Sequence, residues 1–532
     1  MGFSLSPIDV AIIVVSIMLV VVVGLLAGRN QDKTAKGYFL ASGRMPWYII
    51  GAAFVSTSVS SEQIVGTVGA AYKTGMGIAN WEWWSLPVYS LLIVFFIPML
   101  LKNKITTMPE FLSKRFGPLC GYIYSWVMFV AYIVVFLVTV LYSGSLAFSE
   151  LTGWSFNLIL WLTVILVGLY AVKGGLSSVM WTDAVQCLML VGGGVVLFFV
   201  ALGHIPGGWH AMEAAHPERF HLYHGVHDPD APFLGLLMGS VGLFVFYSAA
   251  NQVMIQRVLG ARSTWDGMMG IVFAGLINMI RPLVTCFLGF IVYHWVSVMH
   301  QAPALDKSDK AFTFALQHLA PDWGLRGIIL AGFLAAVMST ISALANSSAT
   351  IFSLDIYHRL INRNAKEKQL IRVGRLASIA ALLIAAVLTP FVDRAGGIFI
   401  YFQTGVTYVA TPFITVILFG LLWKRTNYPA ALFGLIGGTA IQAAIALAAP
   451  AMGYSIHRFY LAFAAQVVIS IGMVIVALMT PAPAESKWKP FQWTPAQLSA
   501  YDDGVIRPWY HSMWLWFAVF AAAWIFVYWR FW

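Results

Sequence analysis

Long apolar stretches follow one another along almost the whole chain, and short polar segments separate them. About 20 apolar residues are enough for an α-helix to cross the hydrocarbon core of a bilayer. The pattern therefore predicts an all-α polytopic membrane protein. It predicts about fourteen membrane-spanning helices, near residues 9–27, 46–70, 81–103, 121–147, 154–172, 179–203, 233–253, 268–298, 325–357, 373–392, 397–421, 428–450, 456–481 and 512–531.

Composition supports the same class of protein. Of the 532 residues, 60% are hydrophobic and 10% are charged, and the mean hydropathy is +0.81. The 31 basic residues outnumber the 21 acidic ones, but they are spread over short loops, which indicates membrane topology rather than nucleic-acid binding. The three cysteines lie in or beside predicted spans and match no disulfide framework or metal-ligand spacing.

The basic residues also predict the orientation of the chain. With the N-terminus outside, the cytoplasmic loops hold most of the Lys and Arg residues, which is the usual distribution in membrane proteins. We therefore expect a multi-pass protein of the cell (plasma) membrane with both termini on the external side. The basic segments on the cytoplasmic side are then residues 29–44, 102–115, 257–262, 359–375, 424–425 and 487–507.

One predicted span, residues 333–355, carries an unusual number of hydroxyl side chains. Ala336, Ser339 and Thr340 share one side of a helix because they are spaced by three and four residues. Hydroxyls and free carbonyls are oxygen ligands suited to a small cation, and unwound carbonyls bind Na⁺ in many secondary transporters. The alternative interpretation is close helix packing through small residues.

Polar residues also interrupt the second and third spans. The run from Ser56 to Ser61 favours helix weakly, and a break there would free the carbonyls near Ser56 and Val59. In the third span, Glu82 and Ser85 share a face among tryptophans, a pattern suited to binding a polyol. The alternatives are a polar seam between helices and an acidic residue within an interfacial aromatic belt.

Further polar positions lie in the remaining spans. Arg281 within the eighth span is costly in a membrane and is expected to pair or to face water. Gln403 in the eleventh span is able to direct its neutral amide into a binding site. Asp183 opens the sixth span, where the default role of an Asp is a helix N-cap. The external loop near residues 204–232 is rich in histidine, but the spacing matches no ligand set, so we expect a solvated loop rather than a metal site.

Several motifs resemble the sodium/solute symporter family, and in particular its sodium/glucose cotransporter branch. They run in the order of that family over residues 8–435. These motifs are SSEQIVGTVGAAY (60–72), WEWWS (81–85), ITTMPEFLSKRFG (105–117), GGLSSVMWTDAVQ (174–186), NQVMIQR (251–257), STISALANSSATIFSLDIY (339–357), YFQ (401–403) and GLLWKRTNYPAALFG (420–434).

The resemblance implies the leucine-transporter-like fold, with two inverted repeats of five helices and a broken first helix in each repeat. It divides the chain into a first helix with its cytoplasmic loop, a first repeat, the His-rich external loop, a second repeat, and three C-terminal helices with a Pro- and Trp-rich cytoplasmic connector. These parts correspond to residues 1–45, 46–203, 204–232, 233–421 and 422–532.

The resemblance also implies roles for individual residues. Asp183 and Ser342 resemble a pair that is linked to a second cation or to coupling in some members. The implied Na⁺ site consists of carbonyls of Ser56, Val59 and Ala336 with the hydroxyls of Ser339 and Thr340. The implied substrate site consists of Gln63, Glu82, Ser85, Gln403 and the gate residue Tyr247.

Two further positions of the predicted substrate site, Phe244 and Asn278, depart from the galactose symporters of this branch, which have a substrate-binding Asn and a substrate-binding Lys there. Each change removes a hydrogen-bonding group, so galactose is a doubtful solute, and Arg281 lies one turn beyond Asn278 as a partial replacement for the lost cation.

The sequence therefore predicts a symporter that uses Na⁺ as coupling ion, needs no cofactor, and imports a hexose or related polyol across the lipid bilayer. The alternatives are another solute, namely a sialic acid, nucleoside, vitamin or monocarboxylate, and more remotely a membrane sensor or membrane enzyme. We expect no enzymatic activity, because the sequence has neither a zinc-protease motif nor a P-loop.

Overall fold

The computed structural model describes residues 5–29, 33–228, 232–321, 323–395, 398–453, 456–499, 505 and 507–532. Within these ranges the chain forms helices and no β-strand, apart from one isolated parallel bridge between Met45 and Ala261. The prediction of an all-α protein is confirmed.

The helices of the first half are α1 (Pro7–Arg29), α2 (Ala35–Leu40), α3 (Trp47–Ser58), α4 (Ser61–Thr74), α5 (Asn80–Trp83), α6 (Ser85–Leu91), α7 (Ile97–Lys102), α8 (Met108–Arg115), α9 (Pro118–Ala131), α10 (Val138–Thr152), α11 (Phe156–Gly203) and α12 (Gly208–Ala215). Those of the second half are α13 (Phe233–Gly235), α14 (Val241–Val245), the π-helix η7 (Phe246–Ala250), α15 (Gln252–Leu259), α16 (Thr264–Ile280), α17 (Pro282–Thr285), α18 (Phe287–Ser297), α19 (Ala311–His318), α20 (Leu325–Thr350), the π-helix η9 (Ile351–Ile361), α21 (Glu367–Leu388), α22 (Ile398–Leu422), α23 (Tyr428–Leu432), α24 (Gly438–Ala451), α25 (Arg458–Met479), α26 (Glu485–Trp488) and α27 (Met513–Phe531).

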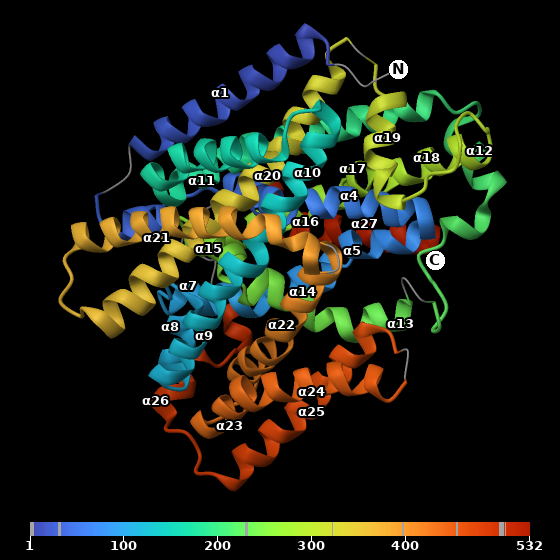
Figure 1. Cartoon of the computed structure of the whole chain (residues 1–532). Coiled ribbons are helices and arrows are strands. Elements are labelled where there is room, and N and C mark those ends of the chain that lie inside the picture. Colours follow the sequence, from blue (N-terminus) through green and yellow to red (C-terminus); the bar gives the residue numbers. More distant parts are fainter. Residues whose placement is uncertain are drawn as a thin grey trace.

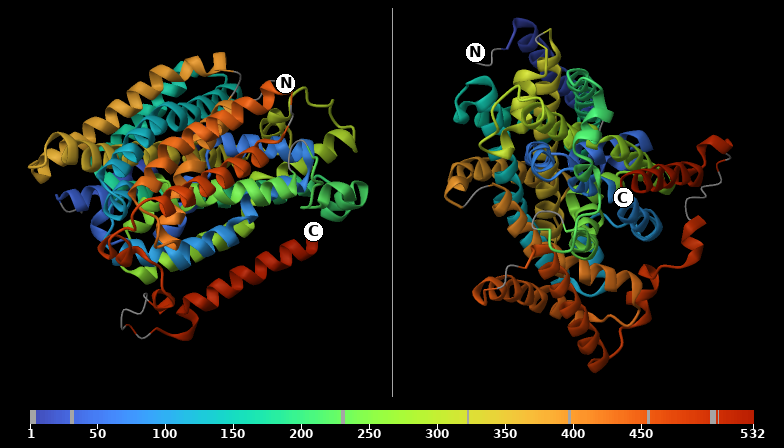
Figure 2. Two further views of the ribbon diagram at one scale, coloured as in Figure 1. Left: turned by 90° about the horizontal axis from the view of Figure 1, so that it is seen from below. Right: turned by 90° about the vertical axis from the view of Figure 1, so that its right-hand side faces the viewer.

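Helix α20 lies at the centre of the bundle. It packs against α11, and α11 also contacts α1 and α3. In the span that begins with α20, 94% of the most apolar 18-residue stretch is buried inside the protein. The corresponding fractions are 17% for α1 and 11% for α27, so these helices present most of their apolar surface to the lipid. Figure 1 shows α1 at one edge of the molecule and α24 and α25 at the opposite edge, and Figure 2 shows α27 running along the outside.

The second predicted span is broken, as the sequence predicts. Helix α3 ends at Ser58, Val59 and Ser60 have extended backbone, and α4 begins at Ser61. The break falls inside the run of hydroxyl and β-branched residues because their side chains compete with the helix or lose rotamer freedom in it. It leaves the last carbonyls of α3 without partners from a continuing helix.

The seventh predicted span is also discontinuous. Phe233–Gly239 and Gly242–Ala250 are bent by 45° relative to each other. The helix then stops at Asn251, whose extended backbone precedes α15 and whose side chain accepts a hydrogen bond from the Val253 amide at 3.1 Å. The second and seventh predicted spans are thus both broken, and a broken first helix in each repeat is the feature that the predicted fold requires.

Three spans differ from the prediction. The eighth is not continuous, because α16 and the following helix are bent by 43° at Arg281, where Pro282 cannot donate a backbone hydrogen bond. The predicted spans 154–172 and 179–203 form one helical run, α11, with a non-helical residue at Gly175. Gly175 has φ +55° and ψ −154°, a conformation that is essentially restricted to glycine.

The predicted number of fourteen spans is not confirmed. The described residues include nine helices long and apolar enough to cross a membrane, or eleven when each bent pair counts as one span. The difference arises mainly at the merged helix α11 and at α3 and α4, which are each too short to qualify alone.

We expect Gly175→Ala to destabilise the protein. A Cβ at this position would lie 2.4 Å from the carbonyl oxygen of Tyr38, and the backbone conformation disfavours any side chain, so the expected loss is about 1–2 kcal/mol or more. Thermal unfolding in detergent measures the loss.

Gly192→Ala in the same helix is the matched control. Its added Cβ would lie in open space, with no atom of another described element within 4 Å, so its unfolding temperature should be unchanged or slightly raised. Equal unfolding temperatures for the two variants would contradict the role given to Gly175.

Candidate functional site

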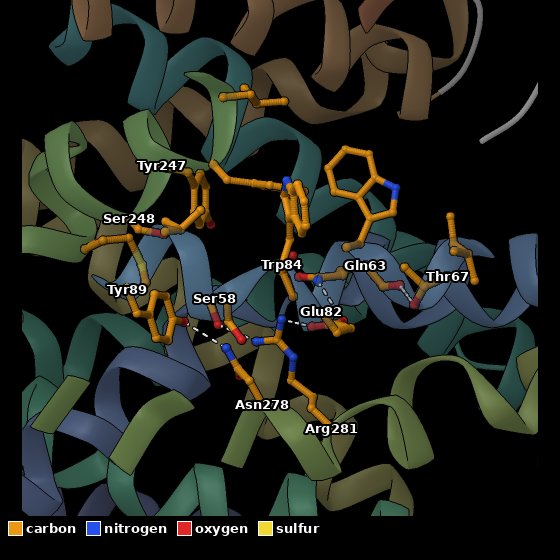
Figure 3. A pocket seen from close by; sticks show the side chains of 18 of the residues that line it. Ser58, Gln63, Thr67, Glu82, Trp84, Tyr89, Tyr247, Ser248, Asn278 and Arg281 are labelled. Carbon is orange, nitrogen blue, oxygen red and sulfur yellow. Dashed lines mark hydrogen bonds and ion pairs between the residues drawn. The ribbon is translucent and has the colours of Figure 1, made fainter. Parts of the chain in front are cut away.

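A cavity of about 200 Å³ lies beside both helix breaks (Figure 3). Its walls are formed by the break after α3, by α4, α5 and α6, by α14 and η7, and by the end of α16. Six of the seven predicted substrate residues line it, namely Gln63, Glu82, Ser85, Phe244, Tyr247 and Asn278. The side chain of the seventh, Gln403, lies outside the described residues, although Val406 of the same helix lines the cavity.

An ion pair between Glu82 and Arg281 forms one wall of the cavity (Figure 3). Both side chains are almost completely buried. Arg281 Nη2 pairs with Glu82 Oε2. The other carboxylate oxygen, Glu82 Oε1, accepts hydrogen bonds from Gln63 Nε2 at 3.0 Å and from Thr285 Oγ1 at 3.1 Å. Arg281 Nη1 donates to Ser58 Oγ at 2.7 Å, so the pair also contacts the end of α3. Arg281 is therefore paired, as the sequence predicts.

Several polar atoms of the cavity lining have no hydrogen-bond partner among the described residues. They are Trp84 Nε1, Ser85 Oγ, Asn278 Oδ1 and Arg281 Nε. Asn278 uses only its amide nitrogen, which donates to Tyr89 Oη at 2.8 Å. A buried polar atom without a partner costs about 1–3 kcal/mol. A solute that carries hydroxyl groups is able to satisfy these atoms.

Aromatic rings form the rest of the lining. Trp81 and Phe244 meet edge to face with ring centroids 5.0 Å apart, and Trp84 and Tyr247 also line the cavity. Such rings cover the apolar faces of a small solute, while the few polar atoms orient it.

The C-terminal helix α27 supports the segment that carries Glu82. Trp524 Nε1 donates to the carbonyl of Trp83 at 2.5 Å, and Tyr528 Oη donates to Asn80 Oδ1 at 2.6 Å. These contacts could not be predicted, because no local pattern in the sequence connects α27 to residues more than 400 positions away.

The predicted Na⁺ ligands lie where α3 ends and on the facing side of α20. Ser56, Val59, Ala336, Ser339 and Thr340 are all buried. Ser56 Oγ is without a partner in the described part of the chain. The hydroxyls of Ser339 and Thr340 donate their hydrogens to Asp183 Oδ1 and to the Ala336 carbonyl, so their lone pairs stay free for a cation. These oxygen donors fit Na⁺.

Asp183 joins these elements and is not a helix cap, which corrects the default interpretation. It lies inside α11, because that helix continues through the expected boundary. Its carboxylate accepts from Ser339 Oγ at 2.7 Å and Thr57 Oγ1 at 3.2 Å, and it pairs with Arg257 Nη2 at 3.2 Å. Ser342 donates to the Ser339 carbonyl at 2.9 Å, so its link to Asp183 runs through Ser339.

Several residues of the site were not predicted. Each of them contacts a predicted residue; they are Arg257, Thr57, Ser58 and Thr285. Arg257 is a charged residue within the NQVMIQR motif, and Thr57 and Ser58 lie within the run from Ser56 to Ser61, whereas Thr285 had no signal in the sequence. In the His-rich loop, His224 pairs with Asp228 at 3.0 Å. No group of three His, Cys, Asp or Glu residues that could hold a metal ion occurs among the described residues of the protein.

Two broken helices beside a buried polar cavity, with a cluster of oxygen donors at one break, define a secondary active transporter. The model of the sodium:solute symporter family matches residues 38–438, and the chain belongs to this family. The predicted family is thus confirmed, and it is a family of transporters rather than enzymes.

Relatives extend over most of the chain. A sodium/glucose cotransporter of Vibrio parahaemolyticus is 32% identical over 459 residues, which cover 81% of this chain and 84% of the relative. A sodium/mannose cotransporter of Bos taurus is 31% identical over 92% of this chain and 90% of its own length. A sodium/myo-inositol cotransporter of Canis lupus familiaris is 29% identical over 91% of this chain and 75% of its own length.

A solved structure has the same fold. It is the substrate-bound outward-open state of a Na⁺-coupled sialic acid symporter, with a TM-score of 0.81 over 90% of this chain and 99% of that chain. The identity is 22%, so this likeness concerns the fold alone. The predicted leucine-transporter-like fold class is confirmed.

We expect Asp183→Ala to cost about 3–5 kcal/mol of unfolding free energy, because it leaves Arg257 as a buried charge without its carboxylate. Denaturation in detergent without Na⁺ measures this structural effect separately from cation binding. The control is Asp306→Ala, which removes a carboxylate from an exposed pair with Lys310 and should change stability very little. Equal losses in the two variants would show that the Asp183 pair has no structural role.

Proposed function

We propose that this protein is a sodium-coupled symporter that imports an uncharged sugar or related polyol by alternating access. The observation that carries the proposal is the cavity itself, in which a neutral ion pair, four unpartnered polar atoms and a wall of aromatic rings surround space for a small solute. The relatives named for glucose, mannose and myo-inositol support the same solute class.

The proposed Na⁺ site uses the carbonyls of Ser56, Val59 and Ala336 and the hydroxyls of Ser339 and Thr340. Its coupling to the solute follows from the chain itself. Ser56 and Val59 alternate with Ser58 and Ser60, which line the cavity. A cation that fixes the end of α3 therefore also fixes two residues of the solute site, and it shifts the conformational equilibrium by its differential affinity for the two states.

A second candidate keeps the fold and the coupling ion but transports an acidic solute. The presence of Arg281 in the cavity lining favours it, because a guanidinium recognises a carboxylate well. The pairing of Arg281 with Glu82 argues against it, since the guanidinium is already neutralised. Nucleosides and vitamins have no specific support among the described residues, and neither has a sensor or an enzyme.

The membrane placement belongs to the same proposal. We place the protein in the plasma membrane with both termini outside, on the distribution of basic residues. We retain residues 46–203 and 233–421 as the two inverted repeats, since the helix breaks at Val59 and Asn251 lie near the start of each. Asp183 and Ser342 are proposed to act in coupling or at a second cation.

The first test is uptake into proteoliposomes of labelled glucose, galactose, mannose, myo-inositol and sialic acid, with and without an inward Na⁺ gradient. We expect accumulation of a neutral solute only with the gradient. Accumulation of sialic acid alone would favour the second candidate, and absence of any Na⁺-dependent accumulation would contradict the proposed function.

The second test changes the Na⁺ site. Ser339→Ala with Thr340→Ala removes two proposed ligands and should raise the half-saturating Na⁺ concentration about tenfold or more, equivalent to about 1.4 kcal/mol. The control is Thr439→Ala with Ser470→Ala, which removes two comparable helix hydroxyls from α24 and α25. Unaltered Na⁺ affinity in the first double variant would remove Ser339 and Thr340 from the site.

A further inference from the structure

Only two charged side chains occur among the described residues that line the cavity, and they are Glu82 and Arg281. We propose that this ion pair sets the charge selectivity of the transporter. While the pair is intact, the site binds an uncharged polyol. Removal of Glu82 leaves a positive charge and redirects the site to an anionic solute, and removal of Arg281 leaves a negative charge and redirects it to a cationic solute. This inference rests on the proposed function, which supplies the solute site.

The contacts of the pair leave no charge for a solute. One oxygen of Glu82 accepts from Gln63 and Thr285, and the other is held by Arg281 Nη2. Arg281 Nη1 is held by Ser58. A solute carboxylate must therefore displace Glu82 from Arg281, and this would leave a buried carboxylate without its cation. A solute ammonium group must displace Arg281 in the same way. Both displacements are costly because the two side chains are almost completely buried.

The unpartnered atoms of the lining point to the same solute class. Trp84 Nε1 and Arg281 Nε are donors, Asn278 Oδ1 is an acceptor, and Ser85 Oγ is both. Hydroxyl groups both donate and accept, so a polyol is able to satisfy all four. A carboxylate only accepts and leaves Asn278 Oδ1 unpaired, whereas an ammonium group only donates and leaves Trp84 and Arg281 Nε unpaired.

The test compares three labelled sugars with the same ring, namely glucose, glucuronate and protonated glucosamine. Na⁺-driven uptake is measured for the wild-type protein and for Glu82→Gln and Arg281→Gln. The wild-type protein should favour glucose over both charged sugars. Glu82→Gln should raise the ratio of glucuronate to glucose uptake about tenfold or more, and Arg281→Gln should raise the glucosamine ratio similarly, since a charge-assisted hydrogen bond is worth about that factor.

Two controls separate charge in the cavity from other effects. Arg281→Lys keeps the charge and should keep the wild-type order of the three sugars, even at lower affinity. Lys310→Gln removes one positive charge from an exposed external pair and should also keep that order. A change of order in either control would overturn the proposal, because the selectivity would then not follow the charge of the pair.

The outcomes also distinguish this inference from the proposed function. Absence of Na⁺-driven uptake by the wild-type protein contradicts the proposed function itself. Wild-type uptake of glucose together with an unchanged order of sugars in both Gln variants overturns the inference alone. If a Gln variant does not fold, competition for labelled glucose uptake by the wild-type protein still tests the inference. Unlabelled glucuronate or glucosamine that inhibits this uptake as strongly as unlabelled glucose does would overturn the inference.

Discussion

The structure depends on one discontinuity, the end of helix α3 inside the bundle. A helix that stops at membrane depth exposes backbone groups that lipid cannot satisfy, so the surrounding protein has to hold it. Two buried ion pairs do this through neighbouring residues. Thr57 donates to the carboxylate of the Asp183–Arg257 pair, and Ser58 accepts from the guanidinium of the Glu82–Arg281 pair.

The two pairs bring together helices that are distant in the sequence. Asp183 and Arg257 connect α11 with α15, and through Ser339 they also hold α20. Glu82 and Arg281 connect α5 with the kink at the end of α16. Such pairs contribute little net stability because desolvation offsets the attraction, but loss of one partner leaves a buried charge. Their role here is to fix the position of the break.

The sequence predicts the fold and the site best where the information is local. The run from Ser56 to Ser61 predicts the break, and the pairing of Glu82 with Ser85 on one face predicts part of the cavity. The sequence was wrong about Asp183 and gave no partner for Arg281, because distant contacts decide both. Asp183 resembles a cap until α11 is seen to continue beyond Gly175, and the partner of Arg281 lies almost 200 residues earlier in the chain. The support from α27 has no local signal of any kind.

The arrangement of the break also explains how a cation and a solute can act on each other without a long relay. Energetic coupling requires an element with two arrangements that both ligands bias. We propose that residues 56–60 are such an element, because the proposed Na⁺ ligands Ser56 and Val59 alternate along the backbone with the cavity residues Ser58 and Ser60. Movement of this segment would change the cation site and the contact between Ser58 and Arg281 together. The distance over which coupling must act is therefore that of neighbouring residues.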